Sequence, residues 1–159
     1  MITPAKLLGI AIKPKRLQPM HTLTTVELSV ELGLVGDSRG KPGRRQVTVL
    51  SQAAWRAACT ELGVELPWTT RRANLLVDAL PLFQSSGARL LIGQVVLEIT
   101  GETDPCSRME AAQPGLFEAL RPDWRGGVCC RVIQGGLLTV GLDVALVQVP
   151  NSPELIITG

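Results

Sequence analysis

The segment Thr100–Glu110, with the sequence TGETDPCSRME, places a cysteine between a proline and a short polar run. The alternating apolar residues before it predict a strand, and the residues after it predict one or two helical turns. If Ser107 caps those turns, Cys106 lies just outside a helix N-terminus, where the helix dipole favours a thiolate. A thiolate can act as a nucleophile, a sulfur carrier or a soft metal ligand. On the local sequence alone, an inert loop thiol is the simpler interpretation and a reactive thiol is the alternative.

The other cysteines and the single histidine offer no comparable site. Cys59 falls on the apolar face of a helix predicted over residues 51–63, which indicates a packed structural thiol. Cys129 and Cys130 are adjacent in a predicted strand, where neighbouring side chains point to opposite faces and cannot easily share a metal ion. His21 has no partner at the spacing of a zinc site or a nucleophilic triad. Cys106 is therefore the candidate for cysteine chemistry.

Arginine dominates the basic residues and supplies a second group of candidates. Twelve of the 16 basic residues are Arg, whose planar guanidinium binds phosphate or carboxylate through two parallel hydrogen bonds. Arg39 and Arg45 lie in a glycine-rich loop predicted over residues 33–45, and Arg71 and Arg72 precede a predicted strand. These positions suit phosphate binding, and solvated surface charge is the alternative. The net charge of +2 does not indicate a nucleic-acid-binding protein.

Short strands are the elements expected to position these residues. The sequence is 45% apolar but only 3% aromatic, which predicts an aliphatic core. Apolar runs separated by Gly and Pro predict eight to ten strands that form a mainly β fold, a closed or partly open β-barrel with a few short helices. The expected strands cover residues 6–14, 24–33, 46–50, 73–80, 88–101 (two strands), 126–136 and 137–149 (two strands).

Three segments of the chain predict helices. The apolar spacing of residues 51–63 indicates an amphipathic helix with Ser51 as its N-cap and Gly63 at its C-terminal end. Residues 107–112 predict a short helix, and Pro114 suits the first turn of another.

The length of the chain, 159 residues, predicts a single domain over residues 1–159 with a core at about 6–147 and a tail at 150–159. No apolar run has transmembrane length and the N-terminus has no signal-peptide pattern, so we expect a cytoplasmic protein that does not bind a membrane.

Five segments together resemble the MOSC domain, the C-terminal domain of molybdenum cofactor sulfurases, in its free-standing bacterial form. Each segment alone is common, but the resemblance covers most of the chain and keeps the order and spacing of the family. The segments are GLVGD (33–37), RRQVTVLS (44–51), RRANLLV (71–77), IGQVVLEITGETDPC (92–106) and GGVCCRVIQGGLLTVGLDV (126–144).

The resemblance implies a β-barrel of the MOSC or pyruvate-kinase-barrel type that binds the molybdenum cofactor (molybdopterin). The functional cysteine of the family corresponds to Cys106, which would ligate molybdenum or carry sulfur. The Arg-x-Asn motif corresponds to Arg72 and Asn74, and the Gly-Asp turn corresponds to Gly36 and Asp37. The candidate cofactor-binding residues are therefore Arg72, Asn74, Arg71, Asp37, Arg39 and Arg45.

Family relatives include the mitochondrial amidoxime-reducing component and bacterial reductases of N-hydroxylated compounds. The resemblance thus implies a molybdoenzyme that reduces a small-molecule N–O substrate. A separate electron-donor protein would be needed, because the sequence has no flavin or iron–sulfur signature. The alternative is a non-redox cofactor carrier, or a sulfurtransferase-type module with a Cys106 persulfide that delivers sulfur to a partner. A third interpretation is a barrel whose cysteine is inert.

Overall fold

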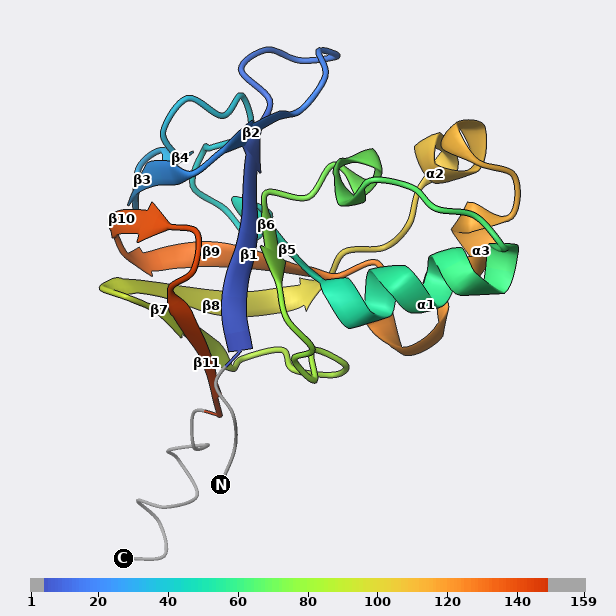
Figure 1. Ribbon diagram of the computed structural model, residues 1–159. Coiled ribbons are helices and arrows are strands. Elements are labelled where there is room, and N and C mark those ends of the chain that lie inside the picture. Colours follow the sequence, from blue (N-terminus) through green and yellow to red (C-terminus); the bar gives the residue numbers. More distant parts are fainter. Residues whose placement is uncertain (1–4, 149–159) are drawn as a thin grey trace, which may run out of the picture.

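The computed structural model describes residues 5–148 and contains eleven strands, three α-helices and two short 3₁₀ helices (Figure 1). The expected tail at 150–159 lies outside the described residues. Within the described part of the chain, no helix has the length and apolar composition needed to cross a membrane. The strands are β1 (Ala5–Ile12), β2 (His21–Leu23), β3 (Thr25–Ser29), β4 (Gly33–Leu34), β5 (Val47–Ser51), β6 (Leu75–Val77), β7 (Arg89–Ile92), β8 (Val95–Glu102), β9 (Val128–Gln134), β10 (Gly136–Thr139) and β11 (Asp143–Val147). The helices are α1 (Gln52–Leu62), η1 (Trp68–Arg71), α2 (Ser107–Ala112), α3 (Leu116–Leu120) and η2 (Pro122–Trp124).

Seven strands close into a mixed barrel in the order β11-β7-β8-β9-β5-β6-β1, because β1 pairs back onto β11. All neighbouring strands are antiparallel except β5 and β6, which are parallel. A parallel pair needs a long crossover connection, and here α1 and η1 supply it. Strand β2 extends the sheet beside β1, while β10, β3 and β4 form a second, three-stranded sheet. The predicted β-barrel is confirmed.

Two apolar clusters hold these layers together. The barrel interior is aliphatic, as expected, and its strands contribute fully buried residues such as Leu7, Leu97 and Val128. The second cluster lies between the helices and the outer face of β5 and β6, where Trp55 of α1 and Met109 of α2 are buried. Figure 1 shows the three helices together on one side of the barrel. The segment that carries Cys106 therefore connects the barrel to this helical layer.

Helix α1 begins and ends where the sequence predicts. Ser51 Oγ accepts a hydrogen bond from the amide of Ala54 at 3.4 Å. Gly63 adopts a left-handed conformation with φ 66°, and its amide donates to the carbonyl of Thr60 at 3.1 Å. The prediction that Cys59 lies on the buried face is also confirmed.

The strand predicted over residues 24–33 is wrong beyond Ser29. The Ser29 hydroxyl accepts a hydrogen bond from the amide of Leu32 at 3.0 Å, and this local turn competes with continued strand pairing. Val30 and Leu32, which continue the apolar alternation, are 45% and 56% exposed. The chain then re-enters the sheet as β4 at Gly33–Leu34, the start of the segment predicted to be a loop.

Helix α2 covers residues 107–112 as predicted, but its N-cap is not Ser107. Cys106 itself is the N-cap of α2 with no side-chain capping bond, and Ser107 is the first helical residue. Helix α3 begins after Gly115, whose φ of 89° suits glycine, so Pro114 precedes the helix.

The sequence prediction of eight to ten strands missed the short strands β2 and β4. With these two, the described residues contain eleven strands.

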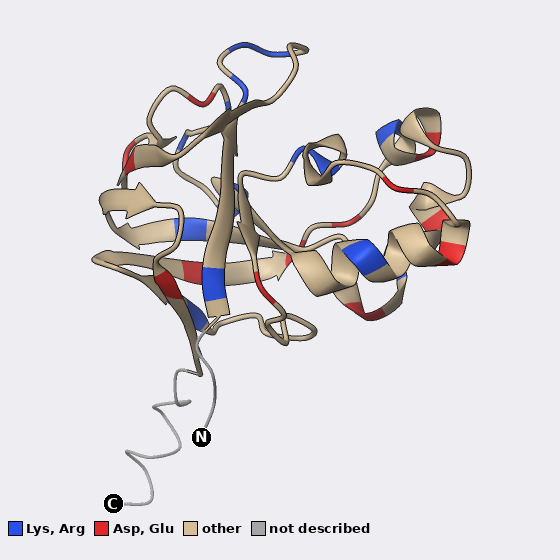
Figure 2. Cartoon of the chain, in the orientation of Figure 1, with Lys and Arg blue, Asp and Glu red and all other residues tan. Residues whose placement is uncertain are grey.

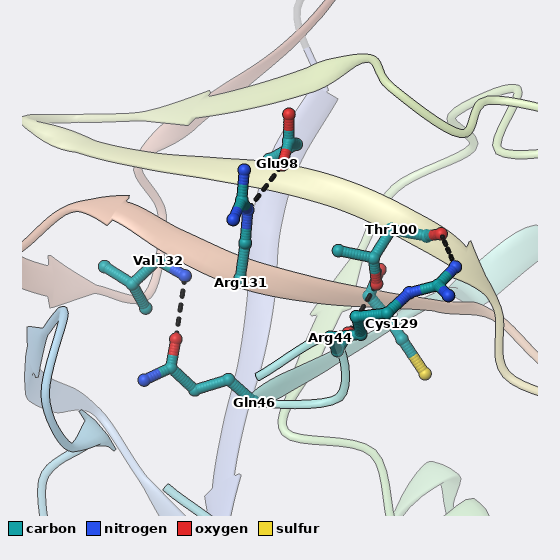
Figure 3. Close-up of polar contacts among 7 residues, drawn as sticks. All are labelled: Arg44, Gln46, Glu98, Thr100, Cys129, Arg131 and Val132. Carbon is teal, nitrogen blue, oxygen red and sulfur yellow. Dashed lines mark hydrogen bonds and ion pairs between the residues drawn. The ribbon is translucent and has the colours of Figure 1, made fainter. Parts of the chain in front are cut away.

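Two buried amide side chains join strands that are distant in the sequence. Asn74 Oδ1 accepts from the amide of Thr48 at 3.0 Å, and its Nδ2 donates to the carbonyl of Ala11 at 3.2 Å. Gln46 Oε1 accepts from the amide of Val132 at 2.9 Å, as Figure 3 shows, while its Nε2 donates to loop carbonyls before β5. Both amides satisfy backbone groups inside the protein, where an unpaired polar group is costly.

Arg71 fixes the segment that leads to Cys106. Its guanidinium is buried and donates from Nε to the carbonyl of Gly126 at 2.9 Å. Its Nη2 donates to the carbonyls of Thr103 at 2.9 Å and Asp104 at 3.3 Å. These bonds connect η1, the chain before β9 and the chain after β8. The position of Cys106 thus depends on the Arg71 side chain.

Gly126 makes this arrangement possible, because a Cβ there would lie 2.7 Å from the carbonyl oxygen of Thr103 and 3.1 Å from Arg71 Nη2. We predict that Gly126→Ala lowers the free energy of unfolding by about 1–3 kcal/mol, the usual cost of overpacking. Urea denaturation followed by circular dichroism measures this change.

Gly101→Ala is the matched control, since a Cβ at Gly101 would meet no atom within 4 Å. We expect this variant to stay within about 1 kcal/mol of the parent protein. Equal stabilities of the two variants would contradict the close packing around Arg71.

Candidate functional site

A cavity of about 520 Å³ lies between the barrel and the helical layer. Its volume is typical of a binding site for a small molecule or cofactor. It brings together five of the seven residues predicted from the sequence, although they are spread over more than 60 positions of the chain. The five are Arg39, Arg45, Arg71, Arg72 and Cys106.

Cys106 is the exposed thiol of this cavity. It lies between β8 and α2, whereas the three other cysteines of the described chain are buried. Arg71 and Arg72 both lie within electrostatic range of its sulfur atom. An exposed sulfur beside two guanidinium groups is available for chemistry, and a thiolate there would have cationic neighbours.

Arg72 presents an unsatisfied donor at the cavity. Its backbone is left-handed with φ 66°, and Nη2 donates to the carbonyl of Gln18 at 3.0 Å. Its Nε is buried and has no hydrogen-bond partner among residues 5–148. Burial lowers the pKa of this guanidinium, and the positive charges of Arg108 and Arg39 lower it further. An anion in the cavity would relieve the repulsion among these guanidinium groups.

Asp37 and Asn74 lie beside the cavity and line a smaller adjoining pocket with Lys13, Arg39 and Arg72. Asp37 Oδ1 accepts from the amide of Lys13 at 2.8 Å, so its carboxylate fixes the end of β1. The Asn74 amide bonds described above use both ends of its side chain. Neither residue lines the larger cavity, and both stabilise the chain around the smaller pocket through these hydrogen bonds.

Sequence reasoning missed three cations of the cavity, Lys13, Arg16 and Arg108. Lys13 is only 7% exposed, and burial lowers the pKa of its amine, as does the nearby positive charge of Arg72. Figure 2 shows basic residues in the loop after β1, in η1 and in α2 on the same side of the molecule. A lysine at the end of a strand is common, so the sequence contains no signal that would single out Lys13.

Cys129 is a second thiol of the cavity that the sequence did not indicate. Its Sγ lies 3.2 Å from Thr103 Oγ1, while Cys130 points into the barrel core. Burial raises the pKa of the Cys130 thiol. The prediction that these adjacent cysteines face opposite sides is confirmed, and the tertiary structure shows that the outward side of β9 meets the cavity.

Arg44, the neighbour of Arg45, is not part of the cavity lining. Its Nη2 donates to the carbonyl of Thr100 at 3.1 Å, and the Thr100 hydroxyl bonds to the carbonyls of Arg44 and Cys129 (Figure 3). Arg44 thus joins the loop before β5 to β8. Of this arginine pair, Arg45 reaches the cavity.

Comparisons with known proteins agree with this architecture. The sequence matches the MOSC domain family over residues 28–145. No curated protein sequence matches the chain significantly. The YUAD protein from Bacillus subtilis superposes with a TM-score of 0.76 at 20% identity, covering 93% of this chain and 98% of that one.

Two other crystal structures have the same fold. YiiM from Geobacillus stearothermophilus has a TM-score of 0.74 at 16% identity, covering 94% of this chain and 78% of that one. YiiM from Escherichia coli has a TM-score of 0.68 at 16% identity, covering 94% and 71% respectively. The family match extends over well more than half of the sequence, and the fold agrees with it. The chain therefore belongs to the MOSC domain family.

Proposed function

We propose that the cavity binds the molybdenum cofactor and that the protein reduces N-hydroxylated or related N–O compounds. One observation carries this proposal: an exposed thiol, Cys106, shares a cavity of about 520 Å³ with seven basic side chains. A thiolate suits molybdenum as a soft ligand, and a set of cations suits the phosphate group of molybdopterin. Arg72 fits the same ligand, because its side chain lines the cavity and a phosphate there would relieve its repulsion with Arg108 and Arg39.

The protein residues would divide the binding of the cofactor between them. Cys106 would ligate molybdenum as a thiolate, and Arg72 with Lys13 and Arg39 would hold the phosphate. Arg71 would position the thiol, since it holds the carbonyls of Thr103 and Asp104. Asn74 would support this wall through its bonds to Thr48 and Ala11.

The bound cofactor would supply two-electron redox chemistry at the metal. Reduction of an N–OH group takes up two electrons and two protons, breaks the N–O bond and releases water. A separate electron-donor protein would supply the electrons. The MOSC family, of which this chain is a member, supports the assignment of the cofactor.

We predict that the protein purified from cells able to make the cofactor contains molybdenum, and that Cys106→Ser lowers the molybdenum content roughly tenfold or more. The reason is that a hydroxyl is a poor ligand for a soft metal centre. Elemental analysis per protein chain measures the content.

Cys59→Ala is the control, because Cys59 is buried in α1 outside the cavity lining. We expect this variant to keep its molybdenum. A parent protein without molybdenum, or a Cys106→Ser variant that retains it fully, would contradict the ligand role.

A second function, sulfur transfer, is favoured by the position of Cys129 in the same cavity as Cys106. The Cys106 thiolate would attack a sulfane sulfur atom of a polysulfide. A new S–S bond would form on Cys106, and the donor's S–S bond would break with the electron pair leaving on the departing sulfide.

We predict for this function that polysulfide treatment adds the mass of one sulfur atom to the peptide containing Cys106, as measured by mass spectrometry. The adduct should be absent from Cys106→Ser and present in Cys59→Ala. If the parent protein retains no sulfur on Cys106, the carrier function is wrong.

A further inference from the structure

Positive charge in the cavity exceeds what its own residues neutralise. Seven basic side chains line it, against one carboxylate, that of Asp104. Two further carboxylates lie nearby: Asp37 lines the adjoining small pocket, and Glu102 is close enough to Asp104 and Arg71 for their charges to shift its pKa. The ion pairs of residues 5–148 involve Lys6, Arg121, Arg125 and Arg131, so none of the cavity cations belongs to one. The basic side chains of the cavity are Lys13, Arg16, Arg39, Arg45, Arg71, Arg72 and Arg108.

These cations differ in how deeply they are buried. Lys13 and Arg71 are buried and Arg72 is half-buried, whereas the other four are exposed. Arg71 donates from Nε and Nη2 to backbone carbonyls, so most of its guanidinium is already engaged with the protein. The charges of the two layers repel one another, because Arg72, Arg39 and Arg108 all lower the pKa of Lys13. The negative charge of Asp37 raises the pKa of Lys13, but its effect is the smallest of the five that act on this amine.

One phosphate group would leave part of this charge without a counterion. Six cations remain when Arg71 is set against the nearby carboxylate of Glu102. A phosphate monoester carries about two negative charges, and Asp104 and the proposed Cys106 thiolate add one each. About two of the six positive charges therefore stay unneutralised in a cavity partly shielded from water, where repulsion is stronger than in bulk solvent.

Arg108 is the cation best placed to receive a second anion. It lies two residues after Cys106 on α2, lines the cavity and is exposed. Its charge is near enough to affect both Lys13 and Arg72. Arg16, in the loop between β1 and β2, lines the same cavity and is also exposed. Both side chains can therefore meet a molecule that enters from solvent beside the Cys106 thiol.

We propose that the substrate of this site is itself an anion, whose carboxylate or phosphoryl group binds Arg108 and Arg16 while its N–O group lies near Cys106. This inference rests on the proposed reductase function. The deeper cations, Lys13 and Arg72, remain for the cofactor phosphate. The substrate class is an N-hydroxylated compound that carries a separate anionic group.

Binding of three matched probes to the cofactor-loaded protein tests the proposal by isothermal titration calorimetry. The probes are benzamidoxime, its para-carboxylate and its para-phosphonate. We expect at least one anionic probe to bind roughly tenfold tighter than the neutral one, and the preference to fall as salt is raised. Tighter binding of the phosphonate would indicate a phosphoryl substrate, and tighter binding of the carboxylate would indicate a carboxylate substrate.

Arg108→Gln should reduce the anionic preference to within about threefold, because it removes one cation of the pair while leaving Arg16. Arg131→Gln is the matched control, since this exposed arginine pairs with Glu98 on the barrel surface. It should keep the full preference. Steady-state kinetics with an electron donor should show a higher KM of Arg108→Gln for the anionic probe and little change in kcat.

Equal binding of the neutral and anionic probes, or no binding of either anionic probe, would overturn the inference. An anionic preference that Arg108→Gln and Arg16→Gln both retain would also overturn it. If the purified protein holds no molybdenum, the same titration is made on that protein, and an anionic preference that Arg108→Gln reduces would support the anion site and contradict the cofactor assignment. The experiments can therefore contradict the anionic-substrate proposal and the cofactor proposal independently of each other.

Discussion

The buried guanidinium of Arg71 is the interaction on which the arrangement of the site depends. A charge inside a protein is tolerated only when hydrogen bonds replace its water. Arg71 donates such bonds to the carbonyls of Gly126, Thr103 and Asp104, and its pKa is nevertheless lowered, first by burial. Because these carbonyls belong to the chain before β9 and the chain after β8, one side chain holds the approach to Cys106 against the barrel. The hydrogen bonds that this buried charge requires thus hold the chain segment that leads to the Cys106 thiol.

The parallel pair of β5 and β6 explains why a cavity forms beside this barrel. A parallel pair needs a crossover, and α1 with η1 packs on the outer face of the two strands, where α2 and α3 join the same apolar cluster. Arg71 and Arg72 end this crossover at the point where it returns to the sheet. The connection therefore delivers two guanidinium groups to the boundary between the barrel and the helices, which is where the Cys106 segment also passes.

Electrostatic repulsion among the cavity cations opposes folding, and the aliphatic barrel must compensate for it. Lys13 illustrates the cost: it is buried, and its pKa is lowered by burial and by three neighbouring arginines. Because folding lowers the pKa of this amine, the folded protein disfavours its charged form when no ligand is bound. The free energy of unfolding therefore decreases as the pH falls below the ordinary pKa of a lysine and the amine becomes protonated. A site with unneutralised charge is common where a ligand supplies the missing counterion, because function then takes precedence over stability.

Local patterns in the sequence were sufficient to predict the elements that have a regular apolar spacing or a clear capping residue. Helix α1 follows from its apolar spacing with Ser51 and Gly63 at its ends, and the opposite directions of Cys129 and Cys130 follow from the pleat of a strand. Strand β3 ended early because the Ser29 hydroxyl closes a turn, a bond that apolar alternation does not reveal. The two-residue strand β4 is too short for any periodicity to be recognised.

The sequence by itself determined a β-rich aliphatic barrel, its main helix and its family, and it indicated Cys106 and the arginine pairs as candidate site residues. Only the tertiary structure decided that Lys13, Arg16, Arg108 and Cys129 share one cavity with them. It also decided that the Asn74 side chain forms hydrogen bonds to the backbone of Thr48 and Ala11 in the barrel. The physical reason is that period and spacing specify which face of an element a residue occupies. Which faces meet depends on closure of the barrel and on the crossover between β5 and β6, which bring distant segments together.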